Sequence, residues 1–184
     1  FPGMGGKLLK FKRSAGDAAF VTRAKELFAK IDDESMQEVK FEIAKVMYDN
    51  IELFPDETER LTEIYVTDCI TKLCAGESYD IDSIIKASQS SGSQIETVIN
   101  HMPKYMDIIC NSIDSMGDKN KRIMMNFIAH VKRAGNFKSW HGMFGGRRKY
   151  LSVLLELAVP IIVTGYGANT FSVPNGWSND ELYE

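Results

Sequence analysis

Apolar residues recur along almost the whole chain at intervals of three and four positions, and this spacing restricts the fold more than any other feature. One example is the set Met36, Val39, Ile43, Val46, Met47 and Phe54. Because an α-helix turns once every 3.6 residues, such a set lies on one helical face. No run alternates apolar and polar residues with turn residues beside it, as a half-buried strand would. The sequence therefore predicts an all-α fold.

Proline and glycine positions indicate where the helices begin and end. Pro55 predicts a helix start, since a proline in the first turn loses no hydrogen bond that the helix needs. Pro103 predicts a break or kink in the helix that opens near Ile95, because an internal proline removes a backbone donor. Gly76 and Gly135 predict C-terminal helix ends. These signals divide the chain into about six to eight helices.

The predicted domain organisation is one globular helical domain with two extensions. The domain covers 14–163 and includes a short helix around 80–88. A basic N-terminal arm precedes it over 1–13, and an extended C-terminal tail, rich in Gly, Pro and Asn, follows over 164–184. A subdivision into two helical parts near 88–92, within the Ser-rich loop there, is the alternative.

Charge is distributed unevenly along the chain, although the net charge is only −3. The net charge is +5 over 1–30, −12 over 31–117, +8 over 118–149 and −4 over 150–184. Oppositely charged patches steer association and fix the orientation of partners. We therefore expect the chain to form a homo-oligomer, and the acidic tail to be able to bind a protein partner.

The segment 118–149 combines nine Lys and Arg residues with interleaved aromatic residues and a single acid, Asp118. Basic groups neutralise phosphates, and aromatic rings stack on unpaired bases. The sequence therefore predicts a surface for an anionic polymer, with RNA as the first candidate. The residues assigned to it are Lys121, Arg122, Lys132, Arg133, Lys138, Trp140, His141, Arg147, Arg148 and Lys149.

A more specific anion site is predicted where this segment enters its last helix. Gly145 and Gly146 allow a close approach to the backbone, and a helix start offers free amides and a positive dipole end. Arg147 and Arg148 add donors suited to phosphate. Cations at a helix start oppose the dipole, so a bound anion would relieve the conflict. The alternative is that the cations are a solvated rim and that the glycines only turn the chain.

A second basic and apolar stretch lies at the N-terminus, with Lys7, Lys10, Lys12 and Arg13 around two leucines and a phenylalanine. Such a pattern suits an anionic membrane surface. It is equally typical of a disordered arm or of a short helix packed on the body. The sequence leaves these three alternatives open.

Signatures of catalysis and metal binding are absent from the sequence. No hydrolase, nucleotide-binding or zinc motif occurs, so we expect no cofactor, no metal and no enzymatic activity. Among the three histidines only His141, in the glycine-flanked loop, is a functional candidate. The odd set Cys69, Cys74 and Cys110 predicts small core residues and a reducing, cytoplasmic location.

The predicted function is that of a non-enzymatic structural or assembly protein, of the nucleocapsid or matrix kind, that binds an anionic polymer or surface through its basic segment. One alternative is a helical protein-interaction module, an adaptor or regulator. The other is a small enzyme that uses His141, Arg147 and Arg148 on a phosphorylated substrate.

Overall fold

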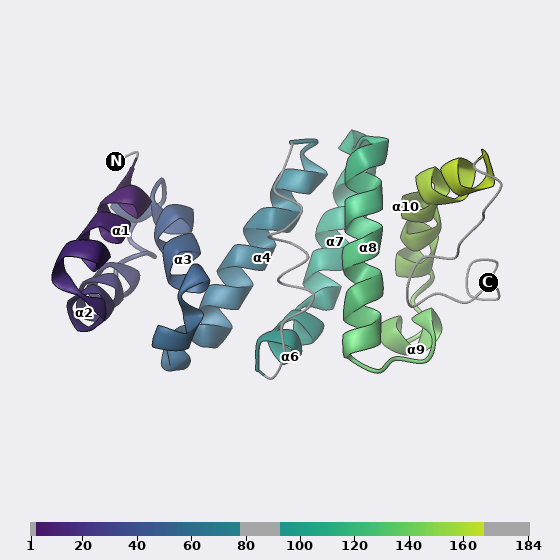
Figure 1. Ribbon diagram of the computed structural model, residues 1–184. Helices are drawn as coiled ribbons and strands as arrows, with labels where there is room; N and C mark the ends of the chain where they lie inside the picture. The colour runs from purple at the N-terminus through teal and green to yellow at the C-terminus, as the bar shows by residue number, and fades with distance from the viewer. Residues whose placement is uncertain (1–2, 78–92, 168–184) are drawn as a thin grey trace. The chain divides into compact units, whose positions relative to one another are not determined.

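The computed structural model describes residues 3–77 and 93–167, and both stretches are helical, with no strand within them (Figure 1). The predicted all-α fold is confirmed. Nine α-helices are described, eight of them at least seven residues long. The α-helices are α1 (Met4–Ala15), α2 (Asp17–Phe28), α3 (Lys40–Asp49), α4 (Thr58–Cys74), α6 (Ser93–Asn100), α7 (Met102–Ser112), α8 (Asp118–Ala134), α9 (Trp140–Phe144) and α10 (Arg148–Gly167). Four 3₁₀ turns join them, namely η1 (Glu34–Met36), η2 (Ile51–Leu53), η3 (Pro55–Glu57) and η4 (Ile113–Ser115).

The contacts between residues group the chain into two compact units, Phe1–Asp68 and Cys69–Glu184. The boundary between the two units falls inside α4. The helix expected at 80–88 and the subdivision expected near 88–92 lie outside the described residues. The single domain over 14–163 therefore stays a prediction.

The first unit is built from α1, α2 and α3, which pack against one another, and from the first part of α4. Phe20 and Phe54 are fully buried and meet edge to face, with ring centroids 5.7 Å apart. Tyr48 stacks on Tyr65 at 4.2 Å. Five of the six residues in the apolar set that includes Ile43 are buried, Met36 being the exception. The single helical face predicted for the set is wrong, because α3 covers only Lys40–Asp49 and leaves Met36, Val39 and Phe54 outside it.

The N-terminal stretch forms α1, which packs on α2 and α3. Leu8 is buried, and Gly5 lies so close to α3 that an added Cβ atom would stand 3.3 Å from Cγ2 of Val46. The sequence left three alternatives open for this stretch. In the structure it is a short helix packed on the body.

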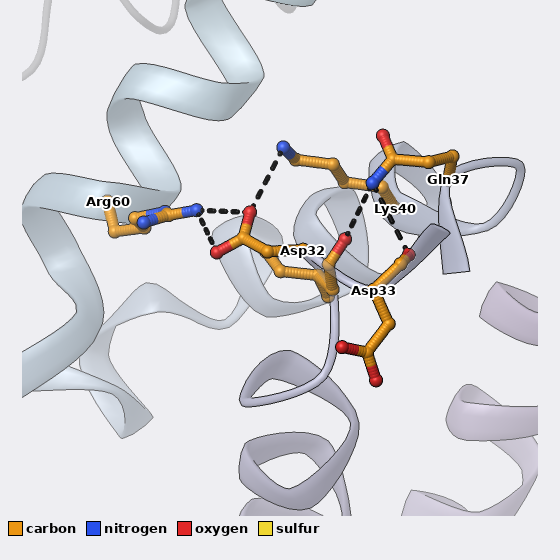
Figure 2. Close-up of polar contacts among 6 residues, drawn as sticks. Asp32, Asp33, Gln37, Lys40 and Arg60 are labelled. Atoms are coloured by element: carbon orange, nitrogen blue, oxygen red, sulfur yellow. Dashed lines mark hydrogen bonds and ion pairs between the residues drawn. The ribbon is translucent and has the colours of Figure 1, made fainter. Parts of the chain in front are cut away.

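Acidic and basic side chains of the first unit pair with one another (Figure 2). The Arg60 guanidinium donates to both carboxylate oxygens of Asp32 at 2.7 and 2.8 Å, and Nζ of Lys40 lies 3.6 Å from the same carboxylate. Lys25 pairs with Glu57 at 3.6 Å. Asp32 is therefore paired with cations from both α3 and α4.

The second unit is organised around α8, which lies side by side with α10 (Figure 1). The two helices run antiparallel, and α9 connects them at one end. α6 packs on α8, and α7 packs on α10. Met124, Met125 and Ile128 of α8 are completely buried. α8 thus contributes seven apolar residues, from Ile123 to Val131, to the described core of this unit.

Two prolines in the second unit have different effects. The helix that opens at Ser93 stops at Asn100, and a new helix starts at Met102 with Pro103 in its first turn, so the predicted break is confirmed. Pro160, by contrast, lies inside α10, which changes direction in Figure 1 but continues to Gly167. The helix thus runs past 164, where the sequence predicts the tail to start, and the extended tail itself stays a prediction. The buried stripe before Pro160 keeps the helix packed, while 168–184 lie outside the described residues.

Cys69 and Cys74 are buried, as the sequence predicts, and Cys110 is half-buried. All three are free thiols. Within the two described stretches, none of the helices has the length and the apolar character that a bilayer crossing needs.

Candidate nucleic-acid interface

The C-terminal end of α8, the short α9 and the start of α10 meet at one end of the second unit (Figure 1). This end carries most of the basic residues that the sequence assigned to an anionic polymer. We call it the basic end and define it by the exposed residues Arg133, Lys138, His141, Arg147, Arg148 and Lys149.

Lys121 and Arg122 are not part of the basic end. They stand eleven residues before Lys132 and Arg133 on α8, which is about three turns and roughly 16 Å of helix. Both pairs lie on the same side of the helix. The residues on that side between the two pairs, Met125 and Ala129, are buried, at 0% and 2% exposed. The structure therefore does not give α8 a continuous basic face.

Lys132 and Trp140 face inward. Lys132 is 5% exposed and Trp140 is 3% exposed, and Nζ of Lys132 lies 5.1 Å from the centre of the Trp140 ring. A cation over an indole ring is a favourable arrangement, more so away from water. The sequence analysis assigned both residues to the binding surface. In the structure both are buried and pack in the core of the unit.

Lys149 is paired with a carboxylate from another helix. Its Nζ donates to Oδ1 of Asp107 on α7 at 3.0 Å, and the hydroxyl of Tyr150 donates to the same oxygen at 2.9 Å. These two hydrogen bonds, in that order, hold the pKa of Asp107 below its ordinary value. The same contact raises the pKa of Lys149. The carboxylate that the start of α10 lacks in sequence is thus supplied by α7.

The remaining cations of the basic end keep their charge available. Lys138 and Arg148 are exposed and make no ion pair with a carboxylate in the part of the chain that the structure describes. Arg147 donates to the Tyr150 hydroxyl at 3.3 Å and lies over its ring. Arg133 donates to Nδ1 of His130, a neutral partner. The basic end is therefore cationic beyond what Asp107 offsets.

The glycines of this loop mainly turn the chain. Gly145 ends α9 with φ 61°, and Gly146 follows with φ 72°, values that side-chain-bearing residues rarely adopt. The imidazole of His141 lies against Gly146, where an added Cβ atom would stand 2.9 Å from the ring. The chain's own imidazole thus approaches the backbone at Gly146, whereas the space beside Gly145 is open.

A pocket of about 460 Å³ opens beside the basic end. Its lining comes from the junction of α6 and α7, from the loop after α8, from α9 and from the start of α10. The lining includes Ile99, Asn100, Phe137, Met143, Phe144, Arg147 and Tyr150. The pocket therefore places apolar and aromatic side chains next to a guanidinium.

The N-terminal cations lie on α1, in the first unit. Lys7, Lys10 and Arg13 are exposed, without an ion pair among the described residues. Lys12 turns toward the body, donates to Oδ1 of Asn50 and lies 5.6 Å from the Phe20 ring centre. A contact of α1 with an anionic surface stays a prediction for the three exposed residues.

Sequence reasoning missed α9, Asp107 and the α6–α7 junction. Ser139 signals α9, since its hydroxyl caps the helix by accepting from the Gly142 amide at 2.9 Å. Pro103 signals the junction, because the break that it imposes leaves one wall of the pocket there. No local signal marks Asp107, which is 42 residues from Lys149.

No protein-family model, no curated protein and no solved structure matches this chain.

Proposed function

We propose that this protein is a non-enzymatic binding protein whose basic end takes hold of an anionic polymer, namely single-stranded RNA, in a structural or assembly role. The pairing pattern carries the proposal. Lys138 and Arg148 have no carboxylate partner in the described stretches, and Arg133 and Arg147 donate to the neutral side chains of His130 and Tyr150. Exposed, unpaired cations are the groups that neutralise phosphates and release counterions.

The structure narrows the set of residues proposed to contact phosphate. Lys149 is paired with Asp107, and Lys132 is buried, so neither is included. The proposed phosphate contacts are Arg133, Lys138, Arg147 and Arg148 at the basic end. A cytoplasmic location is part of the proposal.

A salt titration of RNA binding tests the proposal. Affinity for a fluorescent single-stranded RNA, measured by anisotropy, should fall linearly with salt on a logarithmic scale, since each phosphate contact contributes a slope of about 0.7. The double variant Lys138→Ala/Arg148→Ala should weaken binding and lower the slope by roughly 1.4.

The matched control is Lys30→Ala/Lys45→Ala, which removes the same charge from exposed lysines of the first unit. It should leave the slope unchanged. Equal effects of the two double variants would mean that only net charge matters, and no RNA binding at low salt would refute the proposal.

A second candidate function, a protein-interaction module or a self-associating one, is favoured by one feature of α10. Leu155 and Val159 are 41% and 52% exposed and stand one turn apart on the same face. Apolar anchors at this spacing are typical of helices that bind protein partners. Loss of oligomers or of partner binding in Leu155→Ser/Val159→Ser, seen by light scattering, would support it. A strict monomer at high concentration would contradict self-association.

A further inference from the structure

The pocket beside the basic end has the lining of a site for a flat aromatic ligand. Phe137, Phe144 and Tyr150 contribute three rings to it, and Ile99 and Met143 add aliphatic surface. Phe144 and Tyr150 are buried and meet edge to face at 5.7 Å, so their positions are fixed by packing. Phe137 is half-buried and stays partly accessible. The volume of the pocket, about 460 Å³, lies in the range typical of small-ligand pockets, roughly 300–1,000 Å³.

Two polar side chains of the lining add recognition chemistry. The side chain of Asn100, exposed at the end of α6, has no hydrogen-bond partner in the described part of the chain. An amide offers donors and an acceptor together, which is what the edge of a nucleobase requires. Arg147 contributes a guanidinium, which can stack on an aromatic face or bind a phosphate.

Charge selects among the aromatic ligands that such a pocket admits. The lining contains one cation, Arg147, and no acidic side chain. Arg148 and Lys138 lie close to it in sequence and have no carboxylate partner in the described stretches. An open pocket with aromatic rings and a cationic margin complements a ligand whose flat ring is joined to an anionic backbone.

We propose that this pocket receives an unpaired nucleobase of single-stranded nucleic acid, while Arg147 and Arg148 hold the adjacent phosphates. The inference rests on the proposed function and adds recognition of a base to the contacts with phosphate. Bases in a duplex are stacked and paired, so entry requires a free strand. The protein should therefore prefer single-stranded over double-stranded RNA of the same length.

Photocrosslinking locates the base directly. A single-stranded RNA with one 4-thiouridine, irradiated in complex with the full chain and mapped by mass spectrometry, should crosslink at Phe137 or Met143. Unlabelled single-stranded RNA should compete this crosslink away at a lower concentration than duplex RNA of the same sequence. Crosslinks confined to residues outside the pocket would overturn the inference.

Substitution measures the contribution of the pocket. Phe137→Ala should weaken binding of single-stranded RNA roughly 5- to 150-fold, the range that loss of one stacked base gives. The salt slope should stay at the wild-type value, because no phosphate contact is lost. Phe11→Ala, at an exposed phenylalanine of the first unit, is the matched control and should have no effect.

Asn100→Ala guards against a loss of folding in the Phe137 variant, since Asn100 is exposed and bears no packing role. It should weaken single-stranded binding about 2- to 10-fold and leave thermal unfolding unchanged.

The failures of the two proposals differ. If RNA binds with the expected salt slope, but duplex binds equally well and both pocket variants behave as wild type, the base pocket is refuted and the charged interface stands. If RNA does not bind at all, both are refuted. Binding of an apolar peptide that Phe137→Ala abolishes, without RNA binding, would assign the pocket to a protein partner.

Discussion

Lys149 and Asp107 form an ion pair across two helices of the second unit, with Nζ 3.0 Å from Oδ1. The contact settles a conflict that the sequence raises, because three cations stand at the start of α10, where the helix dipole is positive. The carboxylate of Asp107 brings negative charge to this helix start, and the Tyr150 hydroxyl holds it in place. Asp107 therefore supplies part of the negative charge that a bound anion was predicted to bring to this helix start.

The Asp107 contact predicts a dependence of stability on acid pH. Asp107→Asn should be less stable than wild type at pH 7, because the amide cannot pair with Lys149. The folded pKa of Asp107 is lowered below 3.8, first by the Lys149 hydrogen bond. Its contribution is therefore present above the unfolded value and is lost as pH falls through the folded pKa. Urea denaturation at several pH values should show the two proteins converging below about pH 3.8.

Lys132 is predicted to be a structural residue. Lys132→Ala removes a buried cation from the face of Trp140 and should lower the free energy of unfolding by about 1–3 kcal/mol. Lys138→Ala, six positions on and exposed, should stay within about 0.5 kcal/mol of wild type. Equal stability of both variants in urea denaturation would contradict the packing role.

His130 is predicted to be neutral at pH 7. Burial lowers its pKa from 6.5, and the neighbouring Arg133 adds to the shift. A guanidinium has only donors, so Nδ1 must accept and the ring proton sits on Nε2. The unfolded chain binds the proton first, so stability falls as pH drops below 6.5. An NMR titration should show a higher His130 pKa in Arg133→Ala and an unchanged one in Lys138→Ala.

The three thiols should differ in reactivity. Burial raises the pKa of Cys74 to about 12, so almost none of the reactive thiolate forms near neutral pH. Cys69 is completely buried, whereas Cys110 is half-buried. A thiol reagent should therefore label Cys110 first in the folded protein, and Cys110→Ser should abolish this phase. Fast labelling of Cys74 would show that the end of α4 opens readily.

Gly76 is predicted to be required at the end of α4. Its φ is 82°, and an added Cβ atom would stand 2.9 Å from the Ser115 carbonyl oxygen. Gly76→Ala should lower the free energy of unfolding by about 2 kcal/mol or more, from the left-handed backbone and the clash together. Gly6→Ala, in open space inside α1, should raise it by roughly 0.5–1 kcal/mol. Thermal unfolding of the two variants should shift in opposite directions.

Helix-capping chemistry shows where sequence reading works and where it fails. Gly135 and Pro103 mark helix ends in the sequence, and both positions agree with the structure. Pro160 is also a local signal, yet α10 continues through it, because burial of Leu157 and Ala158 outweighs the lost hydrogen bond. Local rules therefore hold until packing opposes them.

Residue spacing and residue type predict the helical class, the helix ends at Pro103 and Gly135, and the concentration of cations between 118 and 149. These features depend on neighbours within a few turns, so spacing and residue type suffice to predict them. Which cations have a carboxylate partner depends on the packing of the helices. Tyr150 donates to Asp107 and to the Pro103 carbonyl, both more than 40 residues away in sequence. Trp140 is buried, with Nζ of Lys132 over its ring. Such pairings depend on which helices pack together, and the local spacing of residues does not predict this packing.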